Sequence, residues 1–223
     1  MEEMLAPNGP ATRDPATQAA AVAHLRAADP VLAGLVAAVG PPAVRHEPDY
    51  FAALVGAIVG QQISIHAAAA IRARLAARFS PERPLSPAGL LALGEDDLRA
   101  IGLSRAKAVY VADLAAKVAC GAVDLATIDQ LSDEAVIERL VQIKGVGRWT
   151  AEMFLIFSLG RPDVLPVDDL GFRAGVRRHY GLADLPRPAA LRELAEPWRP
   201  YRTFATWYLW RSGSQDPTVV IPQ

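Results

Sequence analysis

The stretch QIKGVGRWTAEM, residues 142–153, decides how the rest of the chain is interpreted. It places Gly145 and Gly147 on either side of one valine, directly between two apolar amphipathic segments. Because glycine adopts positive φ without steric cost, consecutive backbone N–H groups can converge here, where a following helix presents its positive end. Lys144 and Arg148 flank the turn and can add charge. The stretch predicts either a plain turn between helices or a phosphate-binding hairpin.

Two other glycine motifs are excluded by the neighbouring residues. A phosphate-binding P-loop requires Lys followed by Ser or Thr after the second glycine, whereas Arg148 and Trp149 stand here. A dinucleotide-binding fingerprint requires a preceding strand and a third glycine, and neither is present.

Helical periodicity extends outward from this stretch over nearly the whole chain. Apolar residues recur at spacings of three and four, which predicts an all-α protein of roughly ten helices. The clearest segments are 16–28, 50–60, 63–79, 106–120, 132–143, 150–159, 170–180 and 202–212. Residues 1–16 lack this pattern and are expected to form a disordered tail.

Composition restricts the classes of site and the location of the protein. Cys120 is the only cysteine among the 223 residues, so an internal disulfide, a cysteine zinc site and an iron–sulfur cluster are excluded. The N-terminus does not have the pattern of a targeting signal, and the longest apolar run, residues 51–60, is too short to cross a bilayer. We therefore expect a soluble cytoplasmic protein without membrane contact.

Charge is distributed unevenly along the chain. The formal net charge is −1, yet residues 139–211 contain twelve Lys and Arg against seven Asp and Glu, a local net charge of +5. This asymmetry is typical of one basic face that could bind a phosphate backbone. A solvated arginine-rich surface is an equally good interpretation of charge alone.

Five stretches in the right order along the chain resemble the helix-hairpin-helix (HhH-GPD) DNA glycosylase superfamily. LVQIKGVGRWTAEM is similar to its hairpin, and VLPVDDLGFRAG to the loop that carries its essential aspartate, twenty residues beyond Trp149. GQQISIHAAAAI, IGLSRAKAVYVADLA and PWRPYRTFATWYLWR further resemble the 3-methyladenine DNA glycosylase II, or AlkA-type, branch. The resemblance covers about residues 50–211.

The resemblance implies one two-lobed glycosylase domain over residues 17–223. We expect a central lobe at about 61–166 and a terminal lobe from 17–60 together with 167–223. The N-terminal β-domain of longer AlkA-type proteins is not expected, because the residues before the matched region look helical.

The same resemblance assigns the catalytic role to one of two adjacent carboxylates. Asp168 and Asp169 point about 100° apart on a helix, so they cannot act as one acid/base pair. Both could simply cap a helix over 169–180, although a helix N-terminus also favours a negative charge. An ionised carboxylate beside the sugar suits an oxocarbenium-like transition state. The match to the branch favours Asp169, with Asp168 as cap or supporting residue.

The resemblance also implies a base pocket built from Trp149, Met153 and Trp210. Two indoles facing each other across Asp169 would suit a cationic alkylated purine. Lyase-competent relatives carry a lysine in the slot of Trp149. We therefore expect a monofunctional enzyme. Met153 departs from the aromatic residue of the branch, and its flexible side chain could widen the substrate range.

DNA contacts follow from the resemblance as well. Gln62, with Gln61 beside it, takes the position of the family's intercalating residue, although two polar residues near a helix end would be an ordinary feature too. The residues expected to bind the DNA backbone are Lys144, Gly145, Gly147, Arg148, Thr150, Ser104 and Lys107. The carbonyls of Ile143 and Val146 could hold a structural Na⁺ or K⁺, whereas no catalytic metal is expected.

The sequence thus predicts a monomeric DNA glycosylase that excises alkylated purines from double-stranded DNA during base excision repair. The main alternative is a non-catalytic helix-hairpin-helix module that only binds DNA, for which Asp169 and Trp210 would have no use. A bifunctional lyase and a helical small-molecule-binding protein are weaker alternatives.

Overall fold

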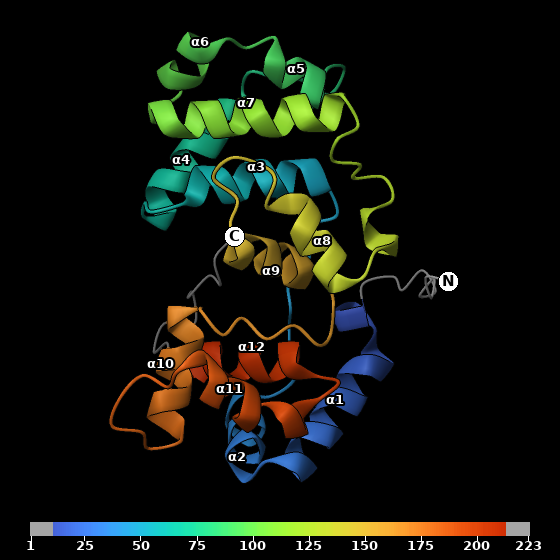
Figure 1. Ribbon diagram of the computed structural model, residues 1–223, viewed down its shortest axis with the longest axis vertical. Coiled ribbons are helices and arrows are strands. Elements are labelled where there is room, and N and C mark those ends of the chain that lie inside the picture. Colours follow the sequence, from blue (N-terminus) through green and yellow to red (C-terminus); the bar gives the residue numbers. More distant parts are fainter. Residues whose placement is uncertain (1–10, 213–223) are drawn as a thin grey trace. The chain divides into compact units, whose positions relative to one another are not determined.

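The computed structural model describes residues 11–212, and this part of the chain is all-α (Figure 1). Its only β feature is an isolated bridge between Ser80 and Arg83. The α-helices are α1 Pro15–Ala28, α2 Pro30–Val39, α3 Tyr50–Gly60, α4 Ile65–Ala76, α5 Pro87–Leu91, α6 Glu95–Ala100, α7 Arg105–Ala119, α8 Asp133–Leu140, α9 Arg148–Phe157, α10 Leu170–His179, α11 Pro188–Leu194 and α12 Arg202–Ser212. Short 3-10 helices lie at Ala11–Arg13, Ile128–Gln130 and Glu196–Trp198.

All eight periodic segments form helices, but the sequence analysis missed α2, α5, α6 and α11. Three of these begin with a proline at the first helical position, a place where its missing N–H costs nothing. A proline before an apolar run was therefore a start signal as well as a breaker. None of the helices in residues 11–212 is long and apolar enough to cross a membrane.

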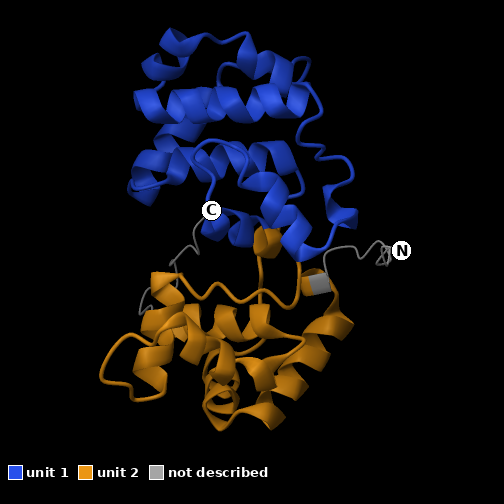
Figure 2. Ribbon diagram, in the orientation of Figure 1, with its two compact units in different colours: residues 1–7, 47–154, 222–223 blue, residues 8–46, 155–221 orange. Residues whose placement is uncertain are grey.

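The chain divides into two compact units (Figure 2). Within the described residues, unit 1 is 47–154 and unit 2 is 11–46 together with 155–212. The predicted lobe boundaries, at 60/61 and 166/167, differ from these. Helix α3 belongs to unit 1 because it packs against α4 and α7, and the second boundary falls inside α9.

The prediction of a disordered tail was wrong for residues 11–16. Ala11–Arg13 forms a 3-10 helix, and α1 begins at Pro15, where Asp14 accepts hydrogen bonds from the N–H groups of Ala16 and Thr17. An aspartate followed by proline is a strong helix start, which outweighs the polar composition. Residues 1–10 of the predicted tail lie outside the described residues.

Unit 1 is organised around α7, which packs against α3, α5 and α6. Its buried residues, Ala108, Val111, Leu114 and Ala115, recur with helical spacing along one face. The turns before α7 and α9 share one pattern: a positive-φ glycine, Gly102 or Gly145, followed by a buried apolar residue and a new helix. The chain therefore makes two hairpins of one kind, the first before α7 and the second before α9.

Unit 2 is organised around α12. Residues 203–210 are all buried, so this helix is covered on every side, and it contacts α1, α2 and α10. Trp198 and Phe204 are completely buried and belong to the core of unit 2. The hydroxyl of Tyr208 donates to the carbonyl of Gly40, and burial raises the pKa of this tyrosine to about 12.

Asp29 joins four segments of unit 2. Its Oδ1 caps α2 by accepting from the N–H groups of Val31 and Leu32, at 2.8 and 3.2 Å. Its Oδ2 accepts from the hydroxyl of Tyr180 at 2.6 Å and from Trp198 Nε1 at 3.0 Å. Burial and this contact with Asp29 raise the pKa of Tyr180. One carboxylate thus satisfies a helix end and two aromatic donors.

We expect the Asp29→Ala substitution to lower the free energy of unfolding by about 3 kcal/mol. It removes a helix cap worth about 1 kcal/mol and leaves two largely buried donors without an acceptor, at about 1 kcal/mol or more each. Urea denaturation followed by circular dichroism measures the change. Asp14→Ala, which removes only the exposed cap of α1, is the control. Equal losses in the two variants would contradict the linking role of Asp29.

Candidate active site

Asp169 is a buried carboxylate at the N-terminus of α10. It is 7% exposed, and its Oδ1 accepts a 2.6 Å hydrogen bond from the N–H of Phe172. The same oxygen accepts a 2.7 Å hydrogen bond from Trp210 Nε1 in α12. Two donors from separate helices therefore fix the plane of this carboxyl group.

Trp210 is held by two contacts within unit 2. Its indole N–H binds Asp169, and its ring stacks on Phe157 with centroids 5.9 Å apart and an angle of 24°. Gly171 leaves room for this contact, because a Cβ there would lie 3.2 Å from Asp169 Oδ1 and 3.3 Å from the indole. The sequence analysis missed Phe157, for which only its place on the helix after the hairpin was visible.

The structure separates the two adjacent aspartates. Asp169 is the N-cap of α10, which begins at Leu170 rather than 169, while Asp168 is exposed. Of the two roles expected for Asp168, cap or supporting residue, the cap belongs to Asp169, because its carboxylate reaches the N–H of Phe172 three residues ahead.

Unit 1 contains a pocket of about 580 Å³ beside the second hairpin. Trp149, Thr150 and Met153 from the first turns of α9 form one wall, because positions 149 and 153 lie on one face of the helix. Met153 is 7% exposed, so its side chain faces inward. The other lining residues are Ala57, Gly60, Gln61, Gln62, Ser104, Ala106, Lys107, Tyr110 and Gly145. Tyr110 was not predicted, since nothing in the sequence distinguished it from its helix neighbours.

Gln61 and Gln62 form a tight turn at the end of α3. Gln61 has φ −56° and ψ 130°, and Gln62 has φ 56°, which are values near those of a type II turn. Among the described residues other than glycine, Gln62 alone has positive φ. Such a backbone costs about 1–2 kcal/mol and is often found at functional sites. The side chain of Gln62 is exposed, whereas Gln61 donates from Nε2 to the carbonyl of Gly145 at 2.8 Å.

The hairpin glycines have different roles. Gly145 has φ +77°, and a Cβ there would overlap the ring of Tyr110. Gly147 does not have positive φ, and a Cβ there would meet open space. The expectation that both glycines use positive φ therefore holds only for Gly145. Gly147 accepts from the N–H of Ala151 and leads into α9, whose first N–H groups have no acceptor within the helix.

Arg148 is held inside unit 1 by two carboxylates. Its two terminal nitrogens donate to Glu134, both at 2.8 Å, and its Nε donates to the buried Glu152 at 3.2 Å. The hydrogen bonds that Arg148 donates to Glu134 are the main reason that the pKa of Arg148 is raised. This differs from the prediction that Arg148 offers its charge to a phosphate, because its charge is already compensated.

Lys144 keeps an exposed side chain at the same hairpin. Its backbone N–H donates to Asp113 Oδ2 at 2.9 Å, while its ammonium lies 4.0 Å from the other oxygen. Partial burial works to raise the pKa of Asp113, but hydrogen bonds from Lys117 and Lys144 outweigh it and hold that pKa below its usual value. The carboxylate thus anchors the hairpin backbone, and the Lys144 side chain, 63% exposed, extends into solvent.

Ser104 and Lys107 stand at the start of α7, beside the first hairpin. Ser104 caps this helix by accepting from the N–H of Lys107 at 3.3 Å. The Lys107 ammonium donates to the carbonyls of Val59 and Gln61, at 2.7 and 2.6 Å. Burial lowers the pKa of Lys107. The prediction that Lys107 binds phosphate did not foresee these two acceptors.

Backbone carbonyls are the candidate cation ligands at the second hairpin. Ile143 and Val146 have buried side chains, and the Ile143 carbonyl accepts the N–H of Val146 at 3.0 Å. A carbonyl oxygen has a second lone pair that could bind a hard monovalent cation, and such a cation at these two oxygens stays a prediction. Within residues 11–212, His, Cys, Asp and Glu do not gather into groups that could hold a metal ion.

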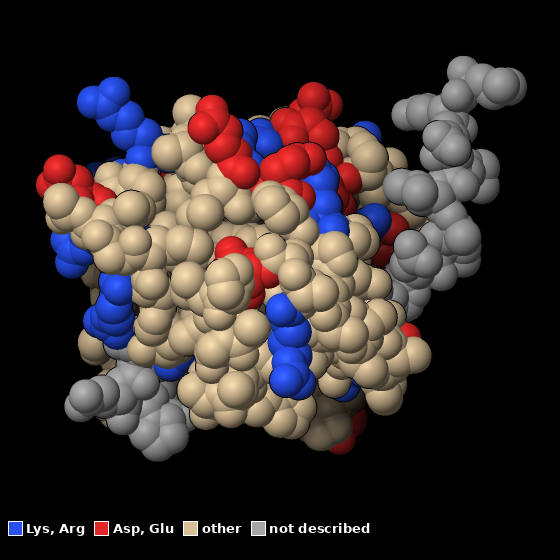
Figure 3. Space-filling view, turned by 90° about the horizontal axis from the view of Figure 1, so that it is seen from below, with Lys and Arg blue, Asp and Glu red and all other residues tan. Residues whose placement is uncertain are grey.

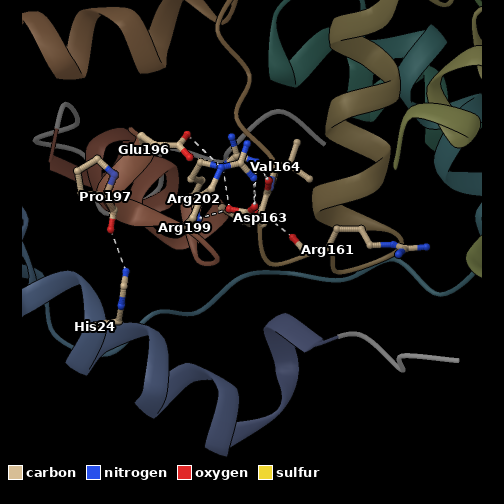
Figure 4. A network of polar contacts seen from close by, with 9 residues as sticks. His24, Arg161, Asp163, Val164, Glu196, Pro197, Arg199 and Arg202 are labelled. Carbon is tan, nitrogen blue, oxygen red and sulfur yellow. Dashed lines mark hydrogen bonds and ion pairs between the residues drawn. The ribbon is translucent and has the colours of Figure 1, made fainter. Parts of the chain in front are cut away.

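Several of the basic residues in 139–211 form ion pairs with acidic side chains. Figure 4 shows Asp163 between Arg199 and Arg202, which donate to its oxygens at 2.7–2.8 Å. On the face drawn in Figure 3, basic and acidic side chains are interspersed among uncharged ones, without a continuous basic surface. The net positive charge of residues 139–211 therefore overstates the number of basic side chains that could bind a phosphate.

The predicted site residues fall into two groups. Trp149 and Met153 lie in unit 1 with the hairpins and Gln62, whereas Asp169 and Trp210 lie in unit 2. The expectation that two indoles face each other across Asp169 involves both units and stays a prediction.

Comparison with known proteins gives one consistent family. Residues 55–200 match the model of the HhH-GPD superfamily of base excision DNA repair proteins. DNA-3-methyladenine glycosylase 1 of Schizosaccharomyces pombe is 35% identical over 194 residues, which cover 85% of this chain and 85% of the relative. DNA-3-methyladenine glycosylase 2 of Escherichia coli is 29% identical over 177 residues.

A solved structure is similar over nearly its full length. The S. pombe 3-methyladenine DNA glycosylase in complex with abasic DNA matches with a TM-score of 0.78 and 36% identity, covering 86% of this chain and 96% of that one. Other relatives are longer: the chain spans 60% of the E. coli protein and 56% of a Bacillus subtilis relative.

We expect Gly145→Ala to destabilise the protein by more than about 3 kcal/mol. The added Cβ adds the strain of a positive-φ alanine, about 1–2 kcal/mol, to an overlap with the Tyr110 ring. Gly147→Ala, with open space at its Cβ, should cost less than about 1 kcal/mol. Urea denaturation of both variants measures the difference. Adding Tyr110→Ala to Gly145→Ala should recover part of the loss, and its failure to do so would refute the overlap.

Proposed function

Because the chain belongs to the HhH-GPD superfamily of base excision DNA repair proteins, we propose that it is a monofunctional DNA glycosylase. It hydrolyses the N-glycosidic bond of alkylated purines of the 3-methyladenine class in double-stranded DNA and leaves an abasic site. The relatives named as DNA-3-methyladenine glycosylases support this substrate class.

The observation that carries the proposal is the fixed carboxylate of Asp169. A backbone N–H and an indole N–H hold one of its oxygens, so the group keeps one orientation without rearrangement during the reaction. Such a preorganised negative charge stabilises the oxocarbenium-like sugar that forms as the base leaves. Trp210 then has a second task beside the predicted pocket wall, because it orients this carboxylate.

The pocket wall of unit 1 suits the proposed base. Trp149 provides an aromatic surface, and Met153 a flexible thioether, at a pocket of about 580 Å³. An indole attracts a cationic alkylated purine by about 1–2 kcal/mol when the contact is dry. A cationic base leaves as a neutral molecule, so a general acid is not required.

The two hairpins bind the DNA backbone in this proposal, and Gln62 fills the space that the flipped nucleotide leaves in the base stack. One phosphate can bind at the N-terminus of α9, where Gly145, Gly147, Thr150 and the exposed Lys144 lie. Ser104 lies at the first hairpin and can bind a second position of the backbone. A flipped nucleotide leaves a gap that a side chain must fill, and Gln62 is exposed at a strained turn. Arg148 supports the hairpin through Glu134 rather than binding phosphate.

The enzyme needs no lysine nucleophile and no catalytic cofactor for this reaction. Trp149 carries no amine and cannot form a Schiff base, which supports hydrolysis without lyase chemistry. The carbonyls of Ile143 and Val146 would hold a Na⁺ or K⁺ that rigidifies the hairpin. A monomer in the cytoplasm is the simplest state for an enzyme of this kind.

The second candidate is a hairpin module that binds DNA without catalysis. The hairpins of unit 1 alone would suffice for it. The buried Asp169, held by two donors in unit 2, favours the enzyme.

We expect Asp169→Asn to reduce base release by at least about 10²-fold, because the charge is lost while the amide oxygen still accepts both hydrogen bonds. Asp168→Asn, at the exposed neighbour, should stay within about twofold of the parent. Single-turnover release of 3-methyladenine from duplexes measures both. The reverse order would transfer the catalytic role to Asp168.

The product should be an intact strand with an abasic site. After complete base release, gel electrophoresis should reveal strand breaks only when alkali is added, and borohydride should trap no covalent complex. Breaks without alkali would contradict the monofunctional mechanism. Absence of base release from every alkylated duplex, despite tight DNA binding, would favour the non-catalytic module.

A further inference from the structure

Lys107 is part of a closed circuit of contacts within unit 1. Its ammonium binds the carbonyls of Val59 and Gln61, the last turn of α3 and the residue before Gln62. The Gln61 side chain then donates to the carbonyl of Gly145 in the second hairpin. Gly145 in turn lies against the ring of Tyr110, three residues after Lys107 on α7.

The circuit acts directly on the conformation of Gln62. The Gln61 carbonyl belongs to the peptide bond that precedes Gln62, so a cation on this oxygen fixes the orientation of that peptide and opposes relaxation of the positive φ. Lys107 also neutralises the negative end of α3. Two of its three donors are used in this way, and burial lowers its pKa.

We infer that Lys107 is a positioning residue. It holds the Gln61–Gln62 turn in the conformation with positive φ at Gln62 and an exposed Gln62 side chain, and it couples this turn to the second hairpin. A phosphate contact at the hairpin would then place Gln62 correctly for entry into the DNA stack. The inference rests on the proposed function, since it assumes that Gln62 fills the gap left by a flipped nucleotide.

The structure offers a test that separates positioning from phosphate binding. A lysine that binds a phosphate contributes about 0.9 to the slope of log K against log salt, whereas a lysine that binds carbonyls contributes nothing to it. Lys107→Met should therefore leave the salt slope of DNA binding unchanged. Lys144→Met, at the exposed hairpin lysine, is the matched control and should reduce the slope by about 0.9.

Base release provides the second readout. Lys107→Met should slow release of 3-methyladenine paired with thymine by about tenfold or more, but by less than about threefold when the partner base is missing and flipping costs little. Lys107→Arg, which can also donate to two carbonyls, should restore most of the rate. Gln61→Met, which cuts the contact with Gly145 and leaves Lys107 intact, should give the same selective loss and serves if Lys107→Met is unstable.

A binding readout keeps this test independent of catalysis. Fluorescence of 2-aminopurine beside a tetrahydrofuran abasic analogue should rise with the parent protein at saturation and rise less with Lys107→Met. A reduced salt slope with equal losses on both substrates would overturn the inference and identify Lys107 as a phosphate ligand. Unchanged fluorescence and rates in Lys107→Met and Gln61→Met would also overturn it. Failure of the parent protein to release any base would instead reject the proposed function.

Discussion

The contact between Gly145 and the ring of Tyr110 is the constraint on which unit 1 depends. The chain reverses there at positive φ, and no side chain fits between this backbone and α7. The close approach sets where α9 begins, and hence where Trp149 and Met153 face the pocket. It also presents the Gly145 carbonyl to Gln61. A turn that looks local in sequence therefore controls the pocket wall and the proposed intercalating turn together.

Unit 2 uses carboxylates in a comparable way. Asp29 caps α2 and receives two aromatic donors, Asp163 receives two arginines, and Asp169 caps α10 while binding Trp210. Each acid satisfies a helix end or loop and a side chain from a distant segment at once. Of the three, Asp169 alone lies in the loop that resembles the catalytic loop of the superfamily. The same physical device that stabilises the fold also orients the proposed catalytic group.

The helical class was predictable because apolar spacing and capping residues act locally. All eight periodic segments formed helices. Of the two adjacent aspartates Asp169 is the buried one, and its catalytic role stays a prediction. The errors came from helix start signals that were overlooked, namely proline at the first helical position and aspartate at the N-cap. The helices that begin with proline, α2, α5 and α11, were missed, and the polar residues 11–16 were expected to be disordered although Asp14 caps α1.

The sequence by itself determined eight of the twelve α-helices in residues 11–212, the hairpin at 142–153 and the family, since these depend on spacings of a few residues and on motif order. Tertiary structure decided which charges are available and which are used internally. Arg148 and Lys107 look like phosphate ligands in sequence, yet carboxylates and carbonyls from other segments bind them. The reason is that the partner of a charged side chain comes from residues far along the chain. Only the folded backbone brings those residues within hydrogen-bonding distance.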